Sequence, residues 1–144
     1  MIPRSSAAGL FIKGEKKLAE AENQLLNYII DEPEFLEPIM KLLGIYDMTQ
    51  EKEKHDKLLE HAYKSALHHV ADKKGNWLYD KIEWGWLENR SIIRALQNGA
   101  IKRWKEGKTK EAKQVFQSLL KTNPNDNSGV RYHLLAILEG MTVK

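Results

Sequence analysis

The stretch SIIRALQNGAIKRWKEGKTKEAKQVFQSLLKTNP, residues 91–124, decides the fold of this chain of 144 residues. Its first half places apolar or small side chains three and four residues apart, as on the buried face of a helix. Gly107 interrupts the pattern, a second stripe of the same period follows, and Pro124 ends it. The stretch therefore predicts two helices packed side by side and joined by a short turn.

The helical period extends outward through most of the chain, and no stretch shows the alternation of a β-strand. We expect helices over about 16–29, 35–46, 50–70, 91–104, 112–120 and 130–138. Pro33 fits the first turn of the second helix, with Asp31 as its cap, and Thr49 fits as the cap of the third. The sequence predicts an all-α fold of about six or seven helices in one domain, residues 1–144.

Residues 71–90 break this pattern with two glycines and a group of aromatic residues, Trp77, Tyr79, Trp84 and Trp86. Large rings contribute much buried area, so we interpret the segment as an ordered connector sealed onto the helices. The alternative is a recognition surface in which Trp84, Trp86 and Arg90 anchor a partner.

An internal repeat becomes visible when residues 106–126 are laid over 12–35. Both stretches run from a glycine through polar residues to a small residue, two apolar turns and a proline. In this register Gly14 marks the turn of a first unit, and only AAGLFI remains of its first helix. A middle unit, about 36–69, fits less closely, because Gln50 replaces the turn glycine and His55 the alanine.

This arrangement resembles the tetratricopeptide repeat, a helix–turn–helix unit of about 34 residues. The resemblance covers 10–70 and 91–140, and its best unit begins at Ile93. The small, turn, alanine, aromatic and terminal positions of that unit fall on Ala100, Gly107, Ala112, Phe116 and Pro124. The resemblance implies a right-handed superhelix of antiparallel helix pairs. An unrelated helical array remains the alternative.

The C-terminal part also resembles a group of uncharacterised bacterial repeat proteins. These end in a phrase like NPNDNxGxRY after a Trp-Gly…Glu-Asn-Arg segment. The phrase maps onto Asn123, Pro124, Asn125, Asp126, Asn127, Gly129, Arg131 and Tyr132. This second resemblance supports the fold and implies no chemistry.

The polar stretch TNPNDNSGVRY, residues 122–132, could be read as a calcium loop. Such a loop needs a glycine at its sixth position and a glutamate at its twelfth. Counted from Asn123, the glycine is seventh and the twelfth residue is Leu134, so we reject a calcium site. We expect a helix corner, in which residue 125, 126 or 127 caps the next helix. Arg131 then either pairs with Asp126 or faces a groove.

Catalytic and metal-binding patterns are missing from the sequence. The chain has no cysteine, and no nucleotide-binding, hydrolase or metalloprotease motif occurs. His61 and His68 are two turns apart on one helix, about 10 Å, which is too far for one metal ion. We therefore expect a protein that is not an enzyme and has no metal or cofactor.

The charge is uneven along the chain, with a net of −3 over residues 1–90 and +6 over 91–144. A basic C-terminal third favours an acidic partner. The basic residues match no nucleic-acid-binding motif, so we do not expect a nucleic-acid partner. No N-terminal apolar run is long enough for a signal peptide or membrane span, and the expected location is cytoplasmic.

Helical repeats usually bind partners on a concave face lined by the first helix of each pair. We expect the groove residues to be Arg94, Gln97, Asn98, Ile101 and Arg131. This set suits an acidic peptide through charge-assisted hydrogen bonds. The resulting hypothesis is a protein-interaction scaffold or adaptor. The alternative is a homodimer that covers an apolar face near Leu18, Leu25 and Ile29.

Overall fold

The computed structural model describes residues 4–141, and the side chains from residue 14 onward. Its helices are α1 (Arg4–Asp31), α2 (Leu36–Met48), α3 (Lys52–Val70), α4 (Leu87–Lys105), α5 (Thr109–Thr122) and α6 (Val130–Leu138). In this range the β-structure is limited to one isolated bridge between Ala71 and Trp77. The prediction of an all-α fold is confirmed.

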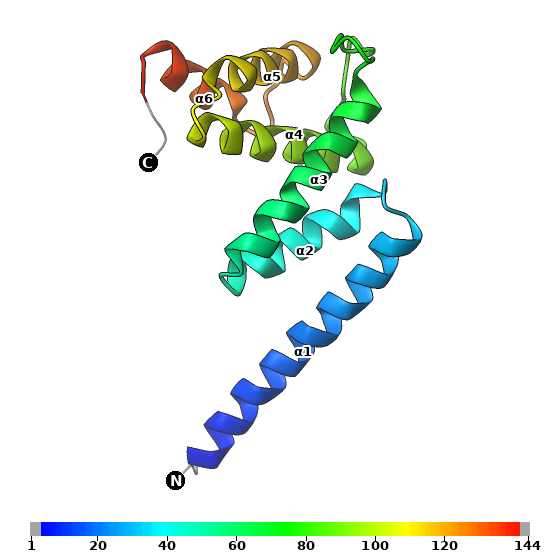
Figure 1. Cartoon of the computed structure of the whole chain (residues 1–144), viewed down its shortest axis with the longest axis vertical. Coiled ribbons are helices and arrows are strands. Elements are labelled where there is room, and N and C mark those ends of the chain that lie inside the picture. Colours follow the sequence, from blue (N-terminus) through cyan, green and yellow to red (C-terminus); the bar gives the residue numbers. More distant parts are fainter. Residues whose placement is uncertain (1–3, 142–144) are drawn as a thin grey trace.

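Helices α2 and α3 form one antiparallel hairpin, and α4 and α5 form another that lies across its end (Figure 1). Each helix packs against the next along the chain, and this includes α3 and α4, although the connector of residues 71–86 separates these two in the sequence. Helix α4 also contacts α2, which makes it the helix common to both hairpins. Helix α6 packs on α5, and the N-terminal half of α1 extends beyond the rest of the molecule.

The two hairpins turn in the same way. Gln50 and Gly107 both adopt the left-handed conformation, with φ of 58° and 84°. In each turn, this residue and the next donate backbone hydrogen bonds to carbonyl groups three and five residues earlier. This is the Schellman arrangement that closes a helix C-terminus. Gln50 therefore takes the geometric place of the turn glycine, although it carries a side chain.

The expected turn at Gly14 is wrong, because α1 runs through this residue as one continuous helix of 28 residues. A glycine in a helix interior costs about 1 kcal/mol relative to alanine, which weakens a helix without ending it. The flanking lysines and glutamate are good helix formers. The first unit is therefore a single long helix.

Three expected helix starts also differ from the structure. Asp31 and Thr49 do not cap α2 and α3, whose N-cap residues are Phe35 and Glu51 without side-chain caps. Thr49 instead ends α2, and its hydroxyl donates to the carbonyl oxygen of Ile45 at 3.0 Å. Pro38, rather than Pro33, lies in the first turn of α2, where a missing N–H costs nothing. Helix α4 begins at Leu87, one turn before the expected position.

The core includes a close crossing of α3 and α4. Tyr63 is one of the largest fully buried side chains, and its ring lies directly against Gly99 of α4. A Cβ atom at position 99 would overlap the ring, so only glycine allows the two helices to approach this closely. The guanidinium of Arg103 then lies over the same ring, 3.7 Å from its centre.

Candidate functional site

A cleft lies between α2 and α4 on one side of the molecule. The two helices are close at their N-termini and diverge towards their C-termini (Figure 1), and the first half of α3 forms the back of the opening. The cleft has a volume of about 640 Å³. Its apolar lining comes from Met40, Leu43, Leu59 and Ile101.

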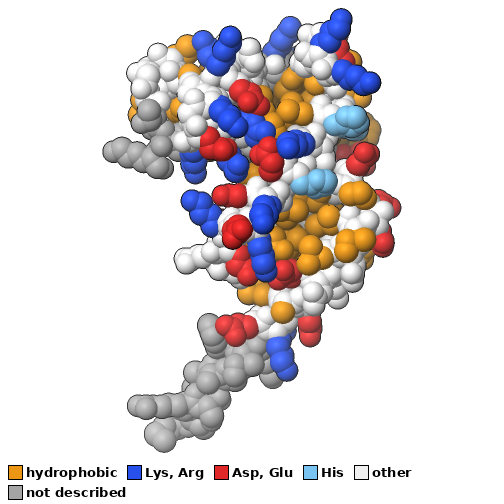
Figure 2. All heavy atoms as spheres, viewed as in Figure 1, with side chains coloured by type: hydrophobic (Ala, Val, Ile, Leu, Met, Phe, Trp, Pro, Cys, Tyr) orange, Lys and Arg blue, Asp and Glu red, His pale blue; other side chains and the backbone are white. Residues whose placement is uncertain are grey.

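Charged residues of both signs surround this apolar lining. Figure 2 shows Lys, Arg, Asp and Glu side chains gathered over the crossing of α3 and α4. Lys102 already has ion-pair partners, because its amine lies 3.0 Å from the carboxylate of Glu106 and 3.7 Å from that of Glu60. Among the described residues, Lys52, Lys105 and Asp47 have no ion pair. Besides these two cations and Asp47, the lining holds Asp56, whose ion-pair contact is with His55 rather than with a lysine or an arginine.

Gly44 lies in the middle of α2 and faces the cleft. A Cβ atom at this position would meet nothing within 4 Å, so no contact within the described structure requires glycine there. A glycine in a helix interior is unfavourable, and one common reason for its presence is the close approach of a ligand to the backbone. The sequence pattern does not identify this residue or its neighbours Met40 and Leu43 as cleft residues, because nothing in α2 alone shows which face stays open.

The expected groove residues separate into two sets. Asn98 and Ile101 both line the cleft. Arg94 is exposed and lies over Trp84, while Gln97 is buried and donates to the carbonyl oxygen of Ser128 at 3.0 Å. Arg131 pairs with Asp126, whose carboxylate accepts from its Nε at 2.9 Å. The last three residues therefore hold other parts of the chain and lie outside the cleft.

The aromatic connector is tied to α4. Trp84 is half-buried, and the guanidinium groups of Arg90 and Arg94 each lie 5.2 Å from its ring centre, within the range of a cation–π interaction. Arg90 also donates from Nε to the carbonyl oxygen of Trp84 at 2.7 Å. Of the three expected anchor residues, only Trp86 presents its side chain freely, with 69% of its surface exposed.

The polar corner after α5 holds two segments together. The backbone N–H of Ile82 donates to the carbonyl oxygen of Thr122 at 2.9 Å, and the side-chain amide of Asn123 donates to the carbonyl oxygen of Ile82 at 3.3 Å. These two hydrogen bonds attach the connector to the end of α5. The N-cap residue of α6 is Gly129, and Asp126, three residues earlier, accepts from the N–H groups of Val130 and Arg131. The corner therefore has a structural role, and of the three expected candidates Asp126 is the one whose side chain binds the first N–H groups of the helix.

The charge balance at Asp126 follows from these contacts. Burial alone would raise the pKa of its carboxyl. The hydrogen bonds from the Arg131 side chain and from the two backbone N–H groups outweigh burial, and the pKa lies below its usual value. The carboxylate is therefore ionised at neutral pH, as a helix N-terminus favours.

An ionic cluster joins α3, α4 and α5. The buried guanidinium of Arg103 lies 2.7 Å from Glu60 and 2.7 Å from Glu111, and the hydroxyl of Tyr63 donates to Glu111 at 3.3 Å. The hydrogen bond from Arg103 lowers the pKa of the Glu60 carboxyl, and burial raises the pKa of the Tyr63 hydroxyl. These groups all have partners within the fold, and we interpret the cluster as a set of interactions that holds α3, α4 and α5 together.

Within residues 4–141, no three His, Asp or Glu side chains lie close enough together to hold a metal ion. In the same part of the chain, none of the helices has the length and apolar character needed to cross a membrane. Comparisons with known protein families, with curated proteins and with solved structures find no match. The function must therefore be inferred from the geometry of the chain itself.

Proposed function

We propose that this chain is a protein-interaction module, without enzymatic activity, that binds a partner peptide in the cleft between α2 and α4. The observation that carries the proposal is the open cleft, with apolar and charged lining residues, between the first helices of two similarly built hairpins. A tetratricopeptide-like superhelix places its partner on this side, and the shared turn geometry at Gln50 and Gly107 supports that arrangement. Gly44 supports it independently, because its bare backbone faces the same cleft.

The chemistry of the cleft favours a short peptide with apolar and acidic residues. Apolar side chains of the peptide would cover Met40, Leu43 and Ile101. Acidic side chains would pair with Lys52 and Lys105, the two lysines of the lining that have no ion pair among the described residues. Such a segment resembles the extended or helical peptides that other grooves take up through regularly spaced anchors.

A peptide library displayed on phage provides the direct test. We expect the purified chain to select peptides with an apolar and acidic pattern, and their affinity is measured by fluorescence anisotropy. Asn98 is exposed at the cleft, so the large ring introduced by Asn98→Trp should fill the cleft. We expect this variant to bind the selected peptides at least tenfold more weakly. Asn23→Trp, on the exposed side of α1, is the matched control and should bind like the unmodified chain. Peptides that bind equally to both variants would contradict the assignment of the cleft.

Gly44→Ala tests the role of the bare backbone. Because nothing lies within 4 Å of the new Cβ, this change should raise the free energy of unfolding by about 0.5–1 kcal/mol. The same methyl group should weaken binding of the selected peptides several-fold. A gain in stability with unchanged affinity would show that the peptide does not approach the backbone at Gly44.

Self-association is the second candidate, and a different surface favours it. The stripe of Leu18, Leu25 and Ile29, expected to be uncovered, is half-buried on the side of α1 that packs against α2. The exposed apolar face lies instead on α6, where Tyr132, Leu135 and Leu138 each have more than half of their surface exposed. Sedimentation velocity over a range of concentrations tests this alternative. A dimer that dissociates in Leu135→Lys would favour it, and a monomer at the highest concentration would exclude it.

A further inference from the structure

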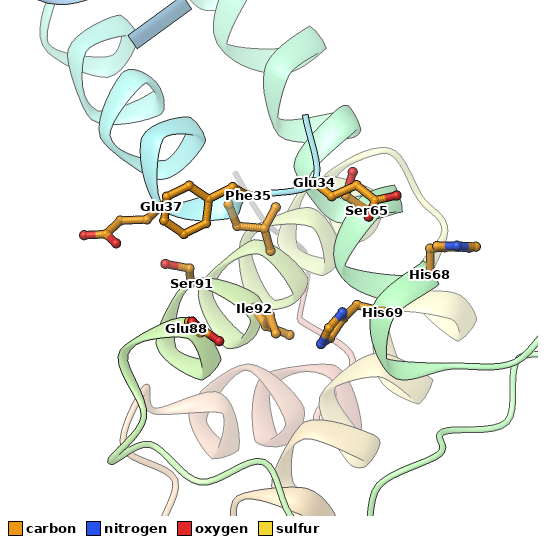
Figure 3. A pocket seen from close by; sticks show the side chains of 10 residues that line it. Glu34, Phe35, Glu37, Ser65, His68, His69, Glu88, Ser91 and Ile92 are labelled. Carbon is orange, nitrogen blue, oxygen red and sulfur yellow. The ribbon is translucent and has the colours of Figure 1, made fainter. Parts of the chain in front are cut away.

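A second, smaller pocket lies where the N-termini of α2 and α4 meet the C-terminal half of α3 (Figure 3). Its volume is about 130 Å³. An apolar protein cavity of about 150 Å³ accepts a molecule the size of benzene, so this pocket is suited to one side chain rather than to a peptide backbone. It shares no lining residue with the cleft between α2 and α4.

The inner wall of the pocket is apolar. Leu36 and Ile92 are buried members of the core, and Phe35 lies above them with 42% of its surface exposed. Figure 3 shows the His69 ring directed towards Ile92 from α3. This wall suits a ligand with a hydrocarbon stem.

The rim of the pocket is acidic. Glu34 and Glu88 line it and have no ion pair among the described residues, whereas Glu37 lies 3.8 Å from Lys41. In Figure 3 the carboxylate of Glu88 points into the gap beside Ile92, and that of Glu37 extends away from it. Each helix N-terminus contributes about +0.5 of a charge. Two full negative charges therefore exceed the two helix ends, and the balance favours a cation.

A serine hydroxyl adds a hydrogen-bonding group to the pocket. Ser91 lines it with only 9% of its surface exposed, and no hydrogen bond within the described part of the chain involves its hydroxyl. The hydroxyl oxygen is therefore available to accept a hydrogen bond from a ligand. Ser65 offers a second hydroxyl from α3.

We propose that this pocket binds a basic side chain, Lys or Arg, presented by a partner polypeptide. The hydrocarbon stem lies on Phe35, Leu36 and Ile92, and the cationic group meets Glu34 and Glu88 while donating to Ser91. The inference does not rest on the function proposed for the cleft, because the two sites take opposite charges and lie at opposite ends of α2.

NMR spectroscopy on the full-length chain tests this assignment with defined probes. Titration with acetyl-Gly-Lys-Gly-amide or its Arg counterpart should shift the backbone amide signals of Ser65, Glu88 and Ile92 in a saturable way. For a single side chain we expect a Kd on the order of 1 mM. The norleucine peptide keeps the stem and lacks the charge, and it should bind at least tenfold more weakly.

Matched variants locate the charge that is recognised. Glu34→Gln with Glu88→Gln should weaken binding of the Lys peptide about tenfold, whereas Glu20→Gln with Glu53→Gln removes the same charge elsewhere and should leave it unchanged. Equal affinity for the Lys and norleucine peptides would overturn the proposal. Amide shifts confined to residues outside the pocket, or equal losses in both double variants, would also overturn it.

Discussion

Helix α4 meets two of its neighbours, α3 and α2, in different ways. Its contact with α3 leaves no open space, because Gly99 lies against the Tyr63 ring. Arg103 lies above the same ring and pairs with Glu60. Helix α4 touches α2 near one end and then diverges from it, which leaves a cleft beside Gly44. Both crossings contain a glycine in the middle of a helix, so residue type alone does not distinguish a required contact from an open surface.

The largest expected effect comes from Gly99→Ala. The new methyl group would overlap three carbon atoms of Tyr63, and the ring cannot move without breaking the contact with Arg103. Overpacking of this kind costs typically about 1–3 kcal/mol, and we expect a loss of stability of about 3 kcal/mol. Urea denaturation measures it, with Gly44→Ala as the matched helix glycine. Equal effects at the two positions would show that the crossings do not differ.

Arg103→Met removes the charge from the closed crossing and keeps the length of the side chain. Glu60 and Glu111 would lose their shared partner, although both are partly exposed and can recover some hydration. Loss of a buried ion-pair partner costs about 3–5 kcal/mol, and partial exposure reduces the expected loss to about 2–3 kcal/mol. Lys102→Met, on the open side of α4, should cost less than about 1 kcal/mol. Denaturation curves of the two variants compare the two sides of one helix.

The two hairpin turns provide a smaller and reciprocal test. Gln50 carries a side chain in a left-handed conformation that Gly107 adopts freely. Gln50→Gly should therefore stabilise the chain by up to about 1 kcal/mol, and Gly107→Ala should destabilise it by about the same amount. Thermal unfolding of both variants measures these changes. A loss of stability in Gln50→Gly would show that the side chain has a role beyond the turn.

The smallest effect concerns acid stability. The hydrogen bond from Arg103 lowers the folded-state pKa of Glu60 below the ordinary value of 4.5. The contribution of ionised Glu60 to the stability of the fold is therefore fully present above pH 4.5, and it is lost as the pH falls through the folded-state pKa. Glu60→Gln should therefore have a flatter stability profile than the unmodified chain below this pH. Chemical denaturation at a series of pH values measures the difference, and parallel profiles would contradict it.

Much of the secondary structure was predictable because apolar residues recur with the helical period. The helices α2, α3, α5 and α6 lie where that pattern placed them, and Asp126 accepts from the first N–H groups of α6 although Gly129 is the N-cap residue. The break expected at Gly14 was wrong because a single glycine is a weak helix breaker when good helix formers surround it.

The candidate sites were less predictable. Asn98 and Ile101 were expected in a groove and do line the cleft, but the other three expected groove residues have partners elsewhere in the fold, and for Arg131 this is the nearby Asp126. Gln97 reaches the carbonyl of Ser128, and Arg94 lies over Trp84. A polar residue on a predicted helix face gives no information about which distant group will approach it.

The sequence by itself determined the all-α class, most of the helices and the corner at residues 123–129, because these depend on local periodicity, capping and turn chemistry. Only the tertiary structure decided which helix faces close and which stay open. That choice depends on the angle and distance between helices, which here are set by contacts such as Gly99 against Tyr63. The cleft and the small acidic pocket both result from how α2, α3 and α4 meet, and no single helix contains that information.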